Sequence, residues 1–220
     1  KRVEKLVELF RLVIQEEMTS ELFASYQQVI NLAGPADVIE VVDQLVQLQI
    51  PMPELKKGIN KALNLLNKSL QNFPYQSPVT GSFLYVLNQN NEQIDLHLKA
   101  IRPLLKEINQ GNQLVKNELK DKFTDLSRID LHYQIKENVF FPIVEKYLPD
   151  YRCLQVMWSF HDDIRRNLKE VIQLLDSENF DIKRFNRLSG DLFFNIYAIK
   201  FREERILFPI ISELIPEKEL

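Results

Sequence analysis

Apolar residues recur at intervals of three and four along most of the chain, which is the spacing of one face of an α-helix. The first stripe consists of Leu6, Leu9, Phe10 and Val13. A later stripe, after a proline break, consists of Leu55, Ile59, Leu63, Leu66 and Leu70. Between them, Pro35 suits the first turn of a further helix. No segment shows the two-residue alternation of a strand, so the pattern predicts an all-α protein.

Prolines and polar turn-forming residues concentrate in one stretch, QNFPYQSPVTGS, at residues 71–82. Such a stretch is typical of a boundary between two regions. We therefore predict an N-terminal helical domain at residues 1–75 and a second domain at residues 76–220.

The second domain reads as four long helices with short connections. Their expected ranges are Phe83–Ile108, Leu114–Tyr147, Cys153–Leu175 and Ile182–Leu214. Pro103 lies inside the first of them and should kink it. Four such helices favour an up-down-up-down bundle, in which the second and fourth helices lie diagonally opposite each other.

The composition of the chain indicates its cellular location and excludes some classes of partner. The 220 residues are 45% hydrophobic and 27% charged, with a net charge of -3. This is globular composition without the clustered basic surface that nucleic acid requires. The one cysteine, Cys153, fits a reducing compartment, and no apolar run reaches membrane-spanning length. We expect a cytoplasmic protein that binds neither nucleic acid nor membranes.

Two segments of the second domain are twins. HYQIKENVFFPIVEKYLP, at His132–Pro149, aligns with IKFREERILFPIISELIP, at Ile199–Pro216, at a constant offset of 67 residues. The landmarks that coincide are Glu137 with Glu204, Phe141 with Phe208, Pro142 with Pro209 and Pro149 with Pro216. A His and a Glu four residues apart share one face of a helix and can both bind one metal ion, which suits iron, manganese or zinc.

The twin segments resemble a known family. DLSRIDLHYQIKENVFFPIVEKYLP, VMWSFHDDIRRNLK and KFREERILFPII are similar to the second, third and fourth helices of hemerythrin-like, HHE-type cation-binding domains. NLAGPADVIEVVDQLVQLQIPMPELKKGINKALNLLNKSL resembles the extra N-terminal helical domain of unknown function in one hemerythrin-like subgroup. The resemblance implies a hemerythrin-like four-helix bundle, and iron with oxygen or nitric oxide as its usual ligands.

Several ligand positions that the resemblance implies hold other residues here. His132 stands where the second helix has its His, but Lys136 replaces the Glu. On the third helix His161 matches, and Arg165 follows four residues later. The fourth helix keeps the carboxylate, as Glu203. Four further positions hold a residue that differs from the one in relatives. These residues are Ile199, Ser82, Asn90 and Ala62.

Two interpretations of this site remain open. His132, His161 and Glu203, helped by Glu137 and Glu204, can hold one iron or another divalent metal, since catalytic zinc sites manage with three protein ligands. Two irons would need more ligands than these. In the second interpretation no cofactor is bound, and a charge network of Lys136, Arg165 and Glu203 occupies the centre of the bundle instead of a metal ion. His97 matches no ligand position, and Glu137 lies about 140 degrees round the helix from His132.

The sequence thus favours a non-enzymatic binding or sensory module whose metal site is mononuclear or lost. The alternatives are a metal-free scaffold or protein-interaction domain, and a binder of haem, through His132 and His161, or of a small molecule. We find no Gly-rich phosphate loop and no pairing of a base with a nucleophile. The expected partner is a signalling protein or a second copy of the chain.

Overall fold

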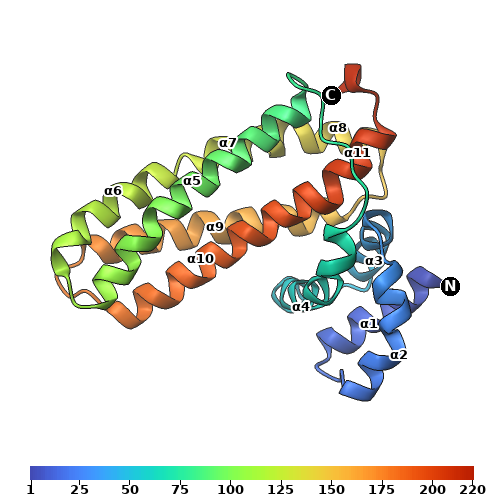
Figure 1. Ribbon diagram of the computed structural model, residues 1–220, viewed down its shortest axis with the longest axis horizontal. Coiled ribbons are helices and arrows are strands. Elements are labelled where there is room, and N and C mark those ends of the chain that lie inside the picture. The colour runs from blue at the N-terminus through green and yellow to red at the C-terminus, as the bar shows by residue number, and fades with distance from the viewer.

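The computed structural model describes residues 1–220 as an all-α protein without strands, as the apolar pattern predicts. Figure 1 shows a long helical bundle with a group of shorter helices packed against one end of it. Both chain termini lie at that end. None of the helices combines the length and the apolar character that crossing a membrane would require.

The N-terminal region contains helices α1 (Arg2–Ile14), α2 (Ser20–Leu32), α3 (Pro35–Gln47) and α4 (Met52–Gln71). Thr19 caps α2 by accepting a hydrogen bond from the Leu22 amide, 3.2 Å away. Pro35 occupies the first turn of α3, where its missing N–H costs nothing. The stretch between α4 and the bundle contains no helix, in agreement with its turn-forming sequence.

The bundle is built from four rods, two of which are composite. The first rod is α5 (Phe83–Asn109) and the third is α9 (Cys153–Asp176). The second rod follows the 3-10 turn Gln113–Val115 and consists of α6 (Lys116–Leu126), α7 (Ile129–Ile135), the π-helical segment Lys136–Phe140 and α8 (Phe141–Tyr147). The fourth consists of α10 (Ile182–Arg202), the π-helical segment Glu203–Leu207 and α11 (Phe208–Leu214), before a last 3-10 turn, Glu217–Glu219.

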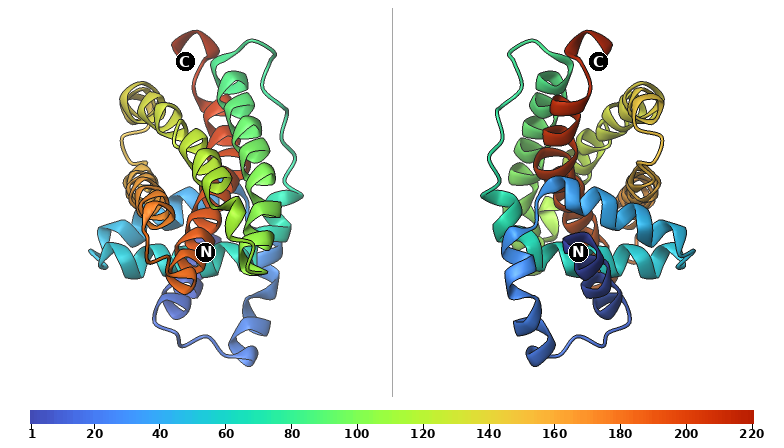
Figure 2. Two further views of the ribbon diagram at one scale, coloured as in Figure 1. Left: turned by 90° about the vertical axis from the view of Figure 1, so that its left-hand side faces the viewer. Right: turned by 90° about the vertical axis from the view of Figure 1, so that its right-hand side faces the viewer.

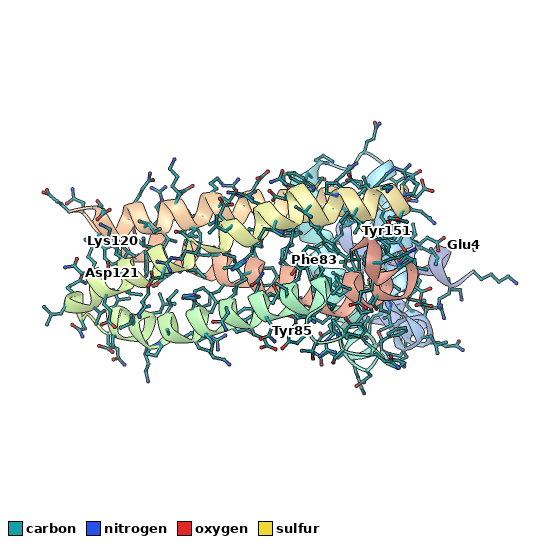
Figure 3. The ribbon with its side chains drawn as sticks, turned by 90° about the horizontal axis from the view of Figure 1, so that it is seen from above. Glu4, Phe83, Tyr85, Lys120, Asp121 and Tyr151 are labelled. Atoms are coloured by element: carbon teal, nitrogen blue, oxygen red, sulfur yellow. The ribbon has the colours of Figure 1, made fainter.

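The rods alternate in direction, and each packs against two others. Contacts join α5 to α6, α6 to α9, α9 to α10 and α10 to α5, so the second and fourth rods are diagonal, as predicted. Figure 3 shows the rods extending along the whole bundle, with Lys120 and Asp121 near the end opposite the N-terminal helices. The twin segments therefore face each other across the bundle.

One detail of the predicted helices is wrong. The second helix is not continuous, because the chain turns at Ser127 and Arg128. The Ser127 hydroxyl donates to the Thr124 carbonyl at 2.6 Å, a local bond that competes with the helical pattern. Helix α5 includes Pro103, and the kink expected there stays a prediction.

The two π-helical segments occupy equivalent places in the twin segments. Phe141 donates its amide hydrogen to the Lys136 carbonyl, and Phe208 donates to the Glu203 carbonyl, each five residues back. A proline follows each of these phenylalanines, and it has no N–H to continue the usual ladder. The wider π turn accommodates one extra residue before the α-helix resumes. The side chains after the π turn therefore point in directions that differ from those of a continuous α-helix.

The buried apolar side chains form one continuous cluster that includes residues of both regions, from Leu6 in α1 to Ile215 after α11. Figure 2 shows the N-terminal helices crossing the end of the bundle rather than extending it. Both views place α3 and α4 beside the bundle, and both helices contact α9 and the π-helical segment Glu203–Leu207. The N-terminal helices thus complete the core at this end.

Candidate functional site

A buried ion pair lies between the twin segments at the centre of the bundle. Lys136 Nζ lies 2.7 Å from Glu203 Oε2, and each side chain is only 1% exposed. These two residues begin the two π-helical segments. Asn91, which α5 brings to the same point, donates its amide to Glu203 Oε2 at 2.9 Å. Lys136 donates to the side-chain oxygen of Asn91, Oδ1, at 3.3 Å. The ammonium group is therefore held by two acceptors.

His161 is held rigidly beside this pair. Its ring stacks on Tyr133 with a centroid distance of 3.9 Å, and Phe141 lies parallel on it at 5.9 Å. Its Nδ1 lies 2.7 Å from Glu137 Oε1. Burial lowers the pKa of His161, and the neighbouring Glu137 offsets only part of this effect. A neutral ring that donates from Nδ1 to a carboxylate leaves the Nε2 lone pair free, as in histidines that bind metals.

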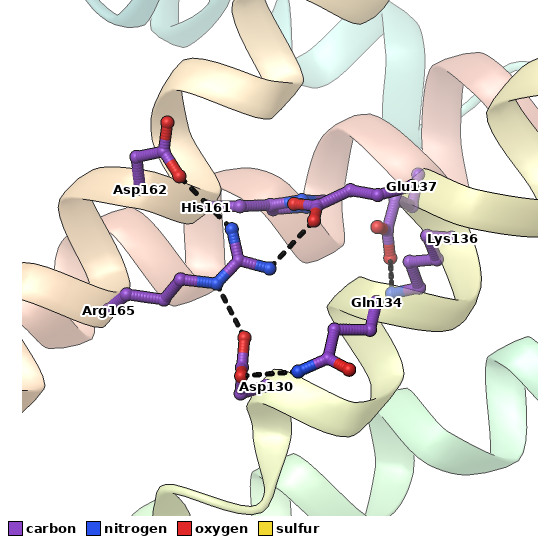
Figure 4. A network of polar contacts seen from close by, with 8 residues as sticks. Asp130, Gln134, Lys136, Glu137, His161, Asp162 and Arg165 are labelled. Carbon is purple, nitrogen blue, oxygen red and sulfur yellow. Dashed lines mark hydrogen bonds and ion pairs between the residues drawn. The ribbon is translucent and has the colours of Figure 1, made fainter.

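Arg165 joins the outer side of Glu137. Its guanidinium donates to Glu137 Oε2 at 2.7 Å and contacts Asp130 and Asp162 (Figure 4). Burial alone would raise the pKa of Glu137, but the hydrogen bonds from His161 and Arg165 outweigh it and lower that pKa. The Arg165 side chain is 29% exposed, so it stands at the rim of the bundle.

This arrangement corrects the predicted charge network. Lys136 and Glu203 do form a central ion pair, but Arg165 does not join it. Arg165 instead pairs with Glu137, which the metal hypothesis treated as a helper ligand. The angular offset of Glu137 from His132 explains this, because it turns that carboxylate toward α9 rather than toward Glu203.

His132, on α7, is half-buried and its Nδ1 has no hydrogen-bond partner. Burial lowers the pKa of His132, and the charge of Lys136 lowers it further. Two other ligand candidates also carry a buried atom without a partner, namely Nε2 of His161 and Oε1 of Glu203. The three residues predicted to bind a metal therefore each retain one buried atom without a hydrogen-bond partner.

The remaining residues singled out in the sequence lie on several elements. Glu204 follows Glu203, is half-buried and approaches Lys200, 3.9 Å away, and its role as a helper ligand stays a prediction. Ser82 caps α5 by accepting from the Tyr85 amide at 3.2 Å. Ala62 is fully buried in the core, and His97 is half-buried on α5. Asn91 was missed by sequence reasoning, which considered its neighbour Asn90, and only the regular apolar register of α5 could have indicated it.

The residues present do not fit the iron centre that the resemblance implies. No group of three or more His, Cys, Asp or Glu side chains is close enough to hold a metal ion. The ammonium of Lys136 lies against the one carboxylate that matches the ligand pattern, and a metal ion there would meet its repulsion. We therefore derive no chemistry from a bound metal.

One of three comparisons with known proteins finds a match, and this match covers most of the helical bundle. Comparison with curated proteins gives no significant match, and comparison with solved structures gives none either. The family model described as the hemerythrin HHE cation binding domain matches residues 82–211, which include the first three rods, most of the fourth rod, the whole first twin segment and most of the second. The N-terminal helices precede the matched region. Since the match spans more than half of the chain, the protein belongs to the hemerythrin HHE cation-binding family.

Proposed function

We propose that this protein is a non-enzymatic binding module of the hemerythrin family in which a lysine ammonium takes the place of the metal ion. The observation that carries the proposal is the ion pair between Lys136 and Glu203, at 2.7 Å and out of contact with solvent. A buried carboxylate without a partner costs several kcal/mol or shifts its pKa until it is neutral. Lys136 supplies the compensating charge from the chain itself.

The surroundings of the pair support a permanent arrangement rather than a vacant site. Asn91 contacts both charged groups, and His161 is fixed by Tyr133 and Glu137. A module of this kind would keep its fold whether or not iron is available. Its function would then lie in what its surfaces bind, with a signalling protein or a second copy as the expected partner and the cytoplasm as the expected location.

Metal content and stability test the proposal directly. Protein purified without chelator should contain less than one tenth of an equivalent of iron, zinc or manganese by elemental analysis. Dialysis against EDTA should leave the melting temperature unchanged. Stoichiometric metal together with a fall in melting temperature on chelation would refute the proposal.

A second candidate function is a mononuclear metal site. It rests on three atoms without a hydrogen-bond partner, His132 Nδ1, His161 Nε2 and Glu203 Oε1, whose side chains would have to move closer together to hold an ion. For a metal to bind there, Lys136 must move away from Glu203. Titration of the metal-free protein with Zn²⁺ and Mn²⁺ tests this candidate, because saturable binding that is lost in His161→Gln would establish it. The haem alternative rests on His132 and His161 alone and stays a prediction.

A further inference from the structure

A groove of about 450 Å³ lies between the N-terminal helices and the bundle, away from the ion pair of Lys136 and Glu203. One wall is α4, and the other is the end of α10 with the start of the adjoining π-helical segment. The groove therefore exists only because the two regions pack together.

The floor of the groove contains a buried arginine whose hydrogen-bonding groups are incompletely satisfied. Arg202 is only 6% exposed. Its guanidinium lies 4.4 Å from the centre of the Phe160 ring, and one terminal nitrogen donates to Asn60. Its Nε and its other terminal nitrogen, Nη1, have no partner, and no carboxylate pairs with it. Buried guanidinium groups are rarely left in this state, because unpaired buried charge is costly.

The other charges around the groove do not neutralise Arg202. Lys200 and Asp95 form an ion pair with each other. Arg205 is exposed and forms no ion pair, while Glu204 lies 3.9 Å from the ammonium group of Lys200 rather than beside Arg202. Burial alone lowers the pKa of Arg202 to about 9, which leaves the side chain charged at neutral pH. The groove thus has a local excess of positive charge.

The α4 wall presents a row of amide side chains to the groove. Asn60, Asn64, Asn67 and Gln71 recur at spacings of four and three, so they share one face of the helix. Of these, only Asn60 has a partner within the protein, namely Arg202. The free amides can donate to and accept from a polar ligand.

The opposite wall is partly aromatic. Phe194, which is 49% exposed, and Tyr197 are one turn apart on α10 and line the groove. The Tyr197 hydroxyl accepts a hydrogen bond from Arg102 at 2.8 Å, which fixes its ring. Apolar walls with a few convergent polar groups are typical of small-molecule sites.

We propose that this groove binds a small organic anion. The Arg202 side chain turns from Phe160 toward the groove, and its free guanidinium nitrogens bond to the carboxylate or phosphate group of the ligand, which Arg205 also attracts. The apolar part of the ligand lies on Phe194 and Tyr197. The amides of Asn64 and Asn67 bond to its polar edge. The ligand would thereby bridge the N-terminal helices and the bundle and stabilise their contact.

Phenyl phosphate, benzoate, inorganic phosphate and benzyl alcohol are the probes that test this site. Calorimetry and thermal shift should show that phenyl phosphate or benzoate binds with one equivalent and raises the melting temperature. Inorganic phosphate should bind more weakly because it lacks the ring, and benzyl alcohol should not bind because it lacks the charge. Added NaCl should weaken binding. Failure of both aromatic anions to bind would overturn the proposal.

Arg202→Met should weaken binding of the aromatic anion about tenfold to a hundredfold, as expected for a lost charge-assisted hydrogen bond. Arg187→Met, at an exposed arginine of α10 outside the groove, is the matched control and should bind normally. If Arg202→Met does not fold, Arg205→Met at the exposed position should still reduce affinity. Unchanged affinity in a folded Arg202→Met protein would show that Arg202 has only a structural role and would also overturn the proposal.

Discussion

At the scale of the residue, the most informative side chain is Lys136. A lysine is almost never fully buried unless it is paired, and this one is held by Glu203 and Asn91. One of the two interpretations of the sequence predicted that Glu203 would pair with Lys136 and Arg165, and the structure contains the first of these pairs. The sequence could not predict that Asn91 would complete the site, since an asparagine among polar helix residues carries no distinguishing signal.

Lys136→Met should lower the free energy of unfolding by about 3–5 kcal/mol, because it leaves Glu203 buried without a counter-charge. The double variant Lys136→Met/Glu203→Leu should regain most of that loss, since a well-packed apolar pair can replace a buried ion pair. Urea denaturation of the single and double variants measures both effects as a thermodynamic cycle. Additive losses in the double variant would show that the two side chains do not interact.

Lys99→Met is the matched control for this cycle. Lys99 is exposed on α5 and forms no ion pair. Its replacement should change the free energy of unfolding by less than about 0.5 kcal/mol.

Cys153 supplies a second prediction at this scale. Burial raises the pKa of its thiol to about 12, so the folded protein holds the proton throughout the physiological range. Reaction with a disulfide reagent at pH 8 should be more than about a hundredfold slower in the folded protein than in urea. Equal rates in the folded and unfolded states would contradict the burial of this thiol.

The same shift gives a pH dependence. The unfolded chain loses the thiol proton near its usual pKa of about 8.5 while the folded chain keeps it. The contribution of Cys153 to stability is therefore complete below that pH and is lost as the pH rises. Cys153→Ala should reduce the slope of stability against pH between about pH 9 and 11, measured by urea denaturation.

At the scale of the element, the sequence predicts the rods well and their local irregularities poorly. The apolar period and the turn-forming stretches indicate the ends of α5, of α9 and of the whole fourth rod to within a few residues. The turn at Ser127 depends on a side-chain bond to the backbone, and such bonds form at many serines inside continuous helices. The π turns follow from Pro142 and Pro209, but a proline alone does not distinguish a kink from a π turn.

Helix packing at Gly58 gives a prediction of its own. A Cβ atom at Gly58 would lie 2.1 Å from Cγ1 of Ile14, so α1 and α4 can approach this closely only because the residue is glycine. Gly58→Ala should destabilise the protein by about 1–3 kcal/mol, through overpacking.

Gly190 is the matched control in α10, because a Cβ atom there would meet nothing within 4 Å. Gly190→Ala should stabilise the protein by about 0.5–1 kcal/mol, through helix propensity. Chemical denaturation of the two variants should give shifts of opposite sign. A neutral Gly58→Ala would mean that α1 does not pack on α4 as described.

At the scale of the whole molecule, the two regions share one hydrophobic core. The division at residues 75 and 76 stays a prediction, since a turn-rich linker indicates where a chain can separate but not how strongly its parts adhere. Lys56 of α4 pairs with Asp163 of α9, and Arg202 donates to Asn60. These contacts join the regions through polar bonds as well as through apolar packing.

Unfolding should therefore be a single transition. The one tryptophan, Trp158, lies on α9 with its ring 6.3 Å from that of Phe141, so its fluorescence reports on a contact within the bundle, whereas far-ultraviolet circular dichroism reports on all helices. The two signals should give coincident urea curves, because separating the regions would expose their shared core. A dichroism change that precedes the fluorescence change would show that the N-terminal helices unfold independently.

The matched positions of the two π turns have one more consequence. Because Lys136 and Glu203 are counterparts across an internal repeat, exchanging them would return the same pair with its polarity reversed. The direction of this ion pair can therefore be reversed only if both residues change. A relative with an acidic residue at the position of Lys136 should have either a basic residue at the position of Glu203 or a complete set of metal ligands. The residues at these two positions would therefore divide hemerythrin-like sequences into those that carry an internal ion pair and those that need a metal ion.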